Sequence, residues 1–451
     1  MCSSDLQSGQ AGASPTPRAA ARPTTAPVPT RATPYPNTTP EAASALIEQA
    51  IGLLLDRYVD PLSSADLYTT AYDGVVAEAG KAGLATPGAR PEFTGVARGD
   101  AARFRQAYLG LMQGAGPQVN QTAVAYMAIR AVATKIDECH TNFLDPDQYQ
   151  QVTASLEGKQ TYGGIGASLR PSTHPTVIGE VFPGTPAEKA GLKPGDQTLA
   201  VDGTDVSDLA ADQVAALVRG DVGTQVRLTI QRPGEPAPRT LTITRAQITV
   251  PVFNARVIDG PNGAKIGYMK VYSFSTGVEK ELDNALKDFQ KQQVTAWVVD
   301  LRDNGGGYIN TLTELASRFE KDGPIGITIT RGGQQETIPI DPKLYLDQQL
   351  PLAVLINAGS ASASEAFSGA MQDYGRAHLV GETSAGCLAA AMIFPLADGS
   401  AMNITIQKIL SPKGHEINRI GVHPDEAVPP DPNSVADPQL QAAVNWLATQ
   451  H

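Results

Sequence analysis

The chain has 451 residues, of which 41% are hydrophobic, and a formal net charge of −11 at pH 7. This length exceeds one ordinary hydrophobic core, so we expect two or three domains. The acidic balance argues against nucleic acid or an anionic membrane surface as a partner, and no apolar run reaches the ~20 residues of a transmembrane helix. The three cysteines, Cys2, Cys139 and Cys387, are too few for a disulfide scaffold and form no CxxC zinc motif. A single disulfide that leaves Cys2 free is compatible with this count.

Residues 1–40 are expected to form a disordered leader or stalk. Residues 1–6 have neither the basic nor the apolar segment of a signal peptide, so we expect no signal segment in this chain. They are either the start of a lipoprotein with a lipid anchor at Cys2, or a translated remnant on a truncated gene. Residues 7–40 are rich in Ala, Pro and Thr, a composition that favours extended polyproline geometry over a packed core.

Residues 41–150 are predicted to form a small helical domain. Thr39 is a suitable cap and Pro40 suits the first position of a helix, after which apolar residues recur at helical spacing up to about Leu55. Further helical patterns cover about 65–81, 100–112 and 119–136. The segment then reaches Asp137-Glu-Cys-His-Thr141.

Residues 160–247 change to short strand patterns separated by Gly and Pro turns, with one helical pattern at 209–218. The stretch Pro186-Ala-Glu-Lys-Ala-Gly-Leu-Lys-Pro-Gly-Asp196, followed by Val201-Asp-Gly203, resembles a PDZ domain. The resemblance places Gly163, Gly164, Ile165 and Gly166 in the loop that binds a peptide's terminal carboxylate. Backbone N–H groups of such a loop can bind a carboxylate while the peptide adds as a strand to a sheet edge. The alternative is a small β-domain that binds nothing.

Residues 248–451 alternate strands and helices, which predicts a mixed sheet covered by helices. Ala296-Trp-Val-Val-Asp-Leu301 is a short apolar strand pattern that runs into the glycine-rich turn Asp303-Asn-Gly-Gly-Gly307. A second such strand, 352–356, is followed by a turn and a helix that starts near Ser362. Free backbone N–H groups at the start of a helix can stabilise an oxyanion. The alternative is that Ser360 or Ser362 only caps the helix.

Several motifs, in order along the chain, resemble the carboxyl-terminal-processing (tail-specific) serine peptidases. The matching segments are Val299-Asp-Leu-Arg-Asp-Asn-Gly-Gly-Gly307, Gly359-Ser-Ala-Ser-Ala-Ser-Glu365, Gly381-Glu-Thr-Ser-Ala-Gly386, Gly421-Val-His-Pro-Asp425 and His140-Thr-Asn-Phe-Leu-Asp-Pro146. The resemblance implies a multi-domain α+β fold with a helical domain, a PDZ β-domain and an α/β core of the ClpP/crotonase type. It also implies Ser362 as nucleophile, with the backbone N–H groups of Ala363 and of Gly306 or Gly307 as oxyanion donors. No metal or cofactor is implied.

The sequence departs from the family pattern at the general base. The family's lysine, 25 positions after the nucleophile, falls on Cys387, and its supporting glutamine falls on Ala391. A thiol cannot replace a desolvated amine as the base for a serine. Relatives of the tricorn type draw a histidine from the segment before the core, which here implies His140 as base. The orienting position falls on Asn418, with Glu416 as substitute.

If His140 reaches Ser362, then Cys139 and Cys387 lie near the same site and can pair as a disulfide. The alternative is two separate buried thiols. A weaker hypothesis makes Cys387 a thiol nucleophile with His423 or His140, and Asp300, Asp303 and Asp373 match no metal-ligand spacing.

The functional hypothesis is therefore a serine endopeptidase that binds the free carboxyl-terminal tails of proteins or peptides through its PDZ domain and cleaves them with Ser362. The contrasting hypothesis is a catalytically inactive pseudopeptidase that acts as a tail-binding adaptor. Since a disulfide suits an oxidising compartment, we expect a bacterial-type protein that is secreted or anchored at the cell envelope.

Overall fold

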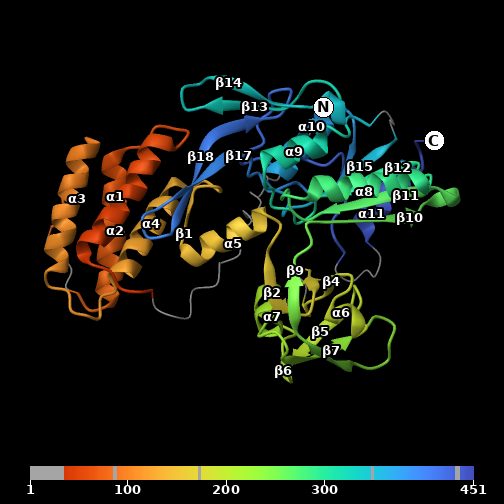
Figure 1. Ribbon diagram of the computed structural model, residues 1–451, viewed down its shortest axis with the longest axis horizontal. Helices are drawn as coiled ribbons and strands as arrows, with labels where there is room; N and C mark the ends of the chain where they lie inside the picture. The colour runs from red at the N-terminus through yellow and green to blue at the C-terminus, as the bar shows by residue number, and fades with distance from the viewer. Residues whose placement is uncertain (1–34, 85–88, 171–173, 347–349, 432–436, 451) are drawn as a thin grey trace, which may run out of the picture.

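The structure is a computed structural model that describes residues 35–84, 89–170, 174–346, 350–431 and 437–450. Cys2 and the predicted leader up to residue 34 lie outside the described residues. Three parts are distinguishable in Figure 1: a helical part at one end, a β-rich lobe below, and a larger α/β part that carries the C-terminus. Among the described residues, no helix combines the length and apolar character needed to cross a membrane.

Four helices form the first part: Pro40–Arg57 (α1), Ser64–Lys81 (α2), Ala97–Met112 (α3) and Gln121–Ile136 (α4). Thr39 caps α1 through the backbone N–H of Ala42, as its position before Pro40 predicts. The helices bury a shared apolar cluster in which Phe104 and Tyr108 are fully enclosed. Two elements that the sequence did not predict follow α4 in the chain: the strand Asn142–Leu144 (β1) and the helix Pro146–Leu156 (α5).

The β-rich lobe is built from short strands and two short helices. Its elements are Thr161–Gly164 (β2), Ala167–Leu169 (β3), Ile178–Val181 (β4), Pro186–Lys189 (α6), Gln197–Val201 (β5), Thr204–Asp205 (β6), Ala211–Val218 (α7), Gln225–Gln231 (β7), Arg239–Thr244 (β8) and Ala246–Thr249 (β9). The strands pair as β6-β5-β7-β8, β2-β9 and β3-β4. They enclose a separate apolar cluster that includes Ile165, Ile178 and Val214.

The α/β part contains two sheets. Its elements are Phe253–Asp259 (β10), Pro261–Gly263 (η1), Lys265–Val271 (β11), Val278–Lys291 (α8), Ala296–Asp300 (β12), Ile309–Ala316 (α9), Pro324–Thr330 (β13), Gln335–Pro339 (β14), Pro342–Leu344 (η2), Leu352–Ile356 (β15), Ala363–Asp373 (α10), His378–Gly381 (β16), Ala389–Pro395 (β17), Ala401–Leu410 (β18), Glu426–Ala427 (β19) and Pro438–Leu447 (α11). One sheet has the order β10-β11-β12-β15-β16-β19, parallel from β11 to β19. Apolar side chains of α8, α9 and α10 pack in one buried cluster with this sheet, and those of α11 in another.

The second sheet joins the helical part to the α/β part. Its order is β1-β18-β13-β14, with β17 paired to β18. Strand β1 pairs antiparallel with β18 in the register Phe143 opposite Met402. Met402 and Ile404 of β18 are buried in the same apolar cluster as the four helices. The chain just before β1, which includes His140, is thereby fixed against a segment more than 250 residues away in sequence.

Parallel pairing of β12 and β15 decides where the predicted site lies. Asp300 at the end of β12 pairs with Leu355 near the end of β15. The carboxyl ends of adjacent parallel strands open at the same edge of a sheet, where α/β proteins commonly bind ligands. The glycine-rich turn after β12 and the serine-containing turn after β15 therefore lie side by side.

Candidate active site

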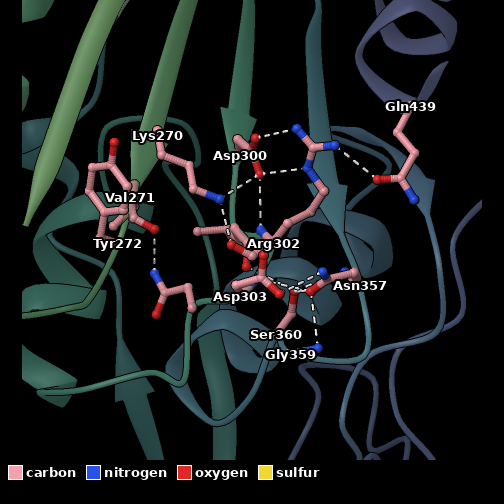
Figure 2. Close-up of polar contacts among 12 residues, drawn as sticks. Lys270, Val271, Tyr272, Asp300, Arg302, Asp303, Asn357, Gly359, Ser360 and Gln439 are labelled. Atoms are coloured by element: carbon pink, nitrogen blue, oxygen red, sulfur yellow. Dashed lines mark hydrogen bonds and ion pairs between the residues drawn. The ribbon is translucent and has the colours of Figure 1, made fainter. Parts of the chain in front are cut away.

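Hydrogen bonds of Asn357 and Asp303 join the serine-containing turn to the glycine-rich turn (Figure 2). The side-chain oxygen of Asn357 accepts from the backbone N–H of Asp303 at 2.9 Å and of Gly359 at 3.0 Å. Its Nδ2 donates to the Asp303 carboxylate at 2.9 Å. Ser360 is fully buried, and its hydroxyl donates to the backbone carbonyl of Leu301 at 2.8 Å. Ser360 is therefore a structural link between the turns.

A buried ion cluster supports the first turn from beneath. The Asp300 carboxylate is 1% exposed and contacts the guanidinium of Arg302 at 2.6 Å and Lys270 Nζ at 3.1 Å. Burial opposes ionisation, but these two positive charges hold the pKa of Asp300 well below its usual range. Lys270 also donates to the backbone carbonyl of Arg302. The guanidinium of Arg302 also donates to the carboxylate of Asp437, which precedes α11. The start of the glycine-rich turn is thus fixed by charge-assisted hydrogen bonds.

Two glycines let the glycine-rich turn pack closely, Gly306 against the serine turn and Gly307 against the backbone of Phe274. Gly306 has a φ of +100°, and a Cβ built on it would lie 2.7 Å from the Cβ of Ser362. A Cβ on Gly307, whose φ is +145°, would lie 2.4 Å from the carbonyl oxygen of Phe274. Both positions require glycine, because an L side chain meets backbone strain and a clash there.

The geometry distinguishes between the two proposed oxyanion donors of this turn. The N–H of Gly306 donates to the Asn304 side chain at 2.8 Å, so that donor is already engaged. Within the described part of the chain, the backbone N–H groups of Gly307 and Ala363 have no hydrogen-bond acceptor. Of the predicted donors, these two groups are free to bind an anion.

Ser362 stands at the start of α10 in a conformation unusual for a non-glycine residue. Its φ of +57° and ψ of −115° leave the helix path, and its hydroxyl makes no capping hydrogen bond. The side chain is half-buried. Strained residues of this kind cluster at functional sites, whereas a capping serine would adopt extended backbone and bond to the first turn. Ser362 occupies the cap position of α10, and its N–H donates to Glu365, but its backbone is not that of an ordinary capping serine.

Glu365, which the sequence analysis did not single out, connects the serine turn to the loop that carries Cys387. Its fully buried carboxylate accepts from the backbone N–H groups of Ser362 at 3.0 Å, Cys387 at 2.9 Å and Gly386 at 2.6 Å, and from the Ser384 hydroxyl at 2.7 Å. Burial raises the pKa of Glu365, although these four hydrogen bonds oppose the rise. The backbone carbonyl of Cys387 in turn accepts from the Ser362 N–H at 3.0 Å.

A disulfide joins Cys139 to Cys387, the pairing expected from the sequence. His140 follows directly, with Nδ1 3.5 Å and Nε2 3.9 Å from the sulfur of Cys387. His140 is thus brought against the residue whose backbone bonds to Ser362. No hydrogen bond joins the Ser362 hydroxyl to the ring in the described residues. Cys387 has no free thiol here, so it cannot be the nucleophile in this state.

The carboxylate beside the His140 ring comes from Glu138, not from the predicted partner. Glu138 Oε1 lies 3.3 Å from His140 Nδ1, and Oε2 accepts from the backbone N–H of His140 and from the Thr405 hydroxyl. Burial would raise the pKa of Glu138, but the bonds from His140 and Thr405 and the charge of His140 lower it to about 2. The described residues give Asn418 no hydrogen bond to His140, and Glu416 is exposed. The signal for Glu138 was its place two residues before the histidine.

The predicted carboxylate loop borders a cavity of about 430 Å³ in the β-rich lobe through Ile165. Gly163 and Gly164 are in β2, Ile165 lines the cavity, and Gly166 turns the chain into β3 with a φ of +85°. Strand β3 pairs only with β4 in the described residues, which leaves its other edge open. Side chains of β3 and α7 line the cavity, which gives the arrangement that strand addition of a peptide requires.

Comparisons with known proteins agree with this architecture. Residues 265–428 match peptidase family S41, and residues 177–232 match the PDZ domain. A carboxyl-terminal-processing protease of Synechocystis is 35% identical over 328 residues, 71% of this chain and 76% of the relative. A carboxyl-terminal-processing protease of Picosynechococcus is 36% identical over 330 residues, 72% of this chain and 79% of the relative.

Solved protease structures are also similar to this chain. The photosystem II D1 C-terminal processing protease is 26% identical, with a TM-score of 0.53 over 91% of this chain and 98% of that one. An S41 protease from Bacteroides fragilis is 16% identical and shares the fold, with a TM-score of 0.60 over 94% and 100% of the two chains.

Fold and comparisons together define a peptidase of family S41 with a helical N-terminal part, a PDZ domain and an α/β peptidase core. Within that class, the chain belongs to the family of carboxyl-terminal-processing proteases.

Proposed function

We propose that the protein is a serine endopeptidase in which Ser362 is the nucleophile and His140 replaces the family lysine as general base. The observation that carries the proposal is the position of His140. The disulfide holds it against Cys387, and the backbone of Cys387 is hydrogen-bonded to that of Ser362. An imidazole that ionises near neutral pH can do the work of a deprotonated lysine.

Glu138 orients the base. A carboxylate on Nδ1 holds the neutral ring in the tautomer whose Nε2 is free to accept a proton, as in other serine and cysteine peptidases. We therefore assign to Glu138 the role that the sequence gave to Asn418. Since Ser362 and His140 are not in direct hydrogen bond, Nε2 must approach the hydroxyl by ring rotation or act through one water molecule when substrate is bound.

The proposed reaction uses the Ser362 hydroxyl, the His140 ring and the two free backbone N–H groups. Ser362 Oγ attacks the scissile carbonyl and passes its proton to His140, and the N–H groups of Ala363 and Gly307 bind the negative oxygen of the tetrahedral intermediate. The protonated imidazole gives its proton to the leaving amine. Water then attacks the acyl-enzyme with His140 again as base.

The PDZ domain would select the substrate. The open edge of β3 can accept the tail as an added strand, and the backbone of residues 163–166 can bind the terminal carboxylate. The disulfide supports an oxidising compartment, so we place the protein outside the cytoplasm. The proposed lipid anchor at Cys2 lies outside the described residues and is tested by the mass of the cell-derived N-terminus.

The test uses an unfolded protein and matched synthetic peptides. We expect wild type to degrade reduced, alkylated casein and Ser362→Ala to leave it intact. Peptides with a free carboxyl end should bind and be cut better than the same peptides with an amidated end. A well-folded wild type that binds free-ended peptides but cuts neither substrate would contradict the enzyme and identify a tail-binding pseudopeptidase.

A further inference from the structure

Cys139, His140 and Cys387 are metal-ligating residue types gathered at one point. Their sulfur and nitrogen atoms all lie within 4.8 Å of one another. In a tetrahedral zinc site with Zn–S bonds of about 2.3 Å and Zn–N bonds of about 2.0 Å, sulfur and nitrogen ligands are about 3.5 Å apart. The sulfur of Cys387 is 3.5 Å and 3.9 Å from the two ring nitrogens of His140. Nδ1 is also 3.3 Å from the sulfur of Cys139, so the three residues are spaced as zinc ligands are.

Glu138 supplies the second feature of a metal-binding histidine. Such histidines usually donate their other ring N–H to a carboxylate, which fixes the ring and raises its basicity. Glu138 Oε1 occupies that place at 3.3 Å from Nδ1, and only 7% of its side chain is exposed. In the disulfide form Nδ1 is the ring nitrogen nearest both sulfurs, so ligation by Nε2 requires the ring to turn once the sulfurs separate.

The backbone on both sides of the disulfide is anchored independently of the sulfur atoms. Cys387 is held by the carboxylate of Glu365 and the N–H of Ser362. On the other side, Arg419 donates to the carbonyl of Asp137 at 2.9 Å. The two Cα atoms are 6.0 Å apart, so rotation of the cysteine side chains can bring the sulfurs to the roughly 3.8 Å that two thiolates need on one zinc ion.

We propose that reduction of the Cys139–Cys387 disulfide converts this point into a zinc site with both thiolates and His140 Nε2 as ligands and water in the fourth position. A dithiol reductant gives two electrons and two protons to the disulfide and itself becomes a disulfide. Two thiols result. Zn²⁺ then binds, and the two thiol protons leave to solvent.

Oxidised and zinc-bound forms are mutually exclusive states of the same three residues. Zinc would occupy the nitrogen that we assign to proton transfer, so the zinc-bound form should be inactive. That consequence depends on the proposed function of His140. Metal binding itself does not, because it is measured without any substrate.

The experiment titrates the full chain with Zn²⁺ against a chromophoric chelator. Protein is reduced with dithiothreitol, freed of reductant under nitrogen, and compared with oxidised protein and with Cys139→Ser/Cys387→Ser. Reduced wild type should bind one equivalent, at least about a hundredfold more tightly than either control, since two of three ligands are lost in each. Co²⁺ should give thiolate charge-transfer absorption in the reduced wild type alone.

Alkylation on wild type provides a measurement that needs no variant. Zn²⁺ should protect Cys139 and Cys387 of the reduced protein from iodoacetamide while Cys2 still reacts. Equal affinity in reduced and oxidised protein, or equal alkylation of all three cysteines with and without Zn²⁺, would overturn the proposal. Either result leaves the test of Ser362 in casein degradation unaffected.

Discussion

Removing the Cys139–Cys387 disulfide should destabilise the α/β core by an amount set mainly by its long loop. The bond joins residues 248 positions apart. The chain-entropy relation gives about 5.5 kcal/mol at 25 °C for a loop of that length, whereas measured losses are typically 2–4 kcal/mol. With a urea dependence of about 2–3 kcal/mol per molar, the unfolding midpoint should fall by about 1–2 M.

Tryptophan fluorescence is a suitable assay because both tryptophans of the chain belong to the core. Trp297 lies in β12 and is 2% exposed, and Trp446 lies in α11. Urea unfolding of wild type with and without reductant is compared with Cys139→Ser/Cys387→Ser and with Cys2→Ser as control. A double variant that unfolds at the wild-type midpoint, or that reductant shifts as much as the wild type, would show that the disulfide does not stabilise the core.

Three further substitutions test the described contacts. The pKa of Glu138 is lowered from 4.5 to about 2, so its ionised carboxylate should add up to about 3 kcal/mol to the free energy of unfolding above pH 4.5, and this contribution is lost as the pH falls towards 2. Glu138→Gln should therefore make unfolding, followed by circular dichroism, less dependent on pH in this range. An unchanged acid transition would contradict the pairing of Glu138 with His140. Gly306→Ala should abolish casein cleavage while Gly305→Ala, where a Cβ meets nothing within 4 Å, retains it; equal activity would refute the close approach to Ser362. Asp300→Asn removes the buried carboxylate from two partly buried cations, of which Arg302 keeps Asp437, and should lower the free energy of unfolding by about 3 kcal/mol in urea. A loss below 1 kcal/mol would show that the cluster does not support the turn.

Periodicity and capping signals were sufficient for the regular elements. The helix predicted over about 65–81 is found at Ser64–Lys81, and the one predicted over 119–136 at Gln121–Ile136. The buried strand predicted at 296–301 is Ala296–Asp300. Where apolar spacing is strong and a cap residue precedes it, local sequence decides the element.

The second sheet was not predicted, for a physical reason. Strands β17 and β18 hold a register set by long-range pairing with each other, with β13 and with β1, and local sequence does not encode such pairing. That sheet is what places residue 140 beside residue 387. The proximity of His140 to the core was reached only through the family resemblance.

The parts of the site with the least sequence signal were the carboxylates. Glu138 and Glu365 both lie in the motifs named above. Which carboxylate faces a histidine, or accepts four hydrogen bonds, depends on how the surrounding loops fold, and residue spacing does not show this. Asn418 was chosen by position in a motif, and the structure places Glu138 at the ring in its stead. Likewise, glycine spacing could not reveal that Asn304 already engages the N–H of Gly306.

The most direct test of the central claim is the rate at which a fluorophosphonate probe labels Ser362, located by mass spectrometry, in oxidised wild type and in His140→Ala. We expect an adduct on Ser362 in wild type and a labelling rate at least about a hundredfold lower without the imidazole. An equal rate in both proteins would show that His140 is not the base. A folded wild type that takes no label at Ser362 would contradict the serine peptidase itself.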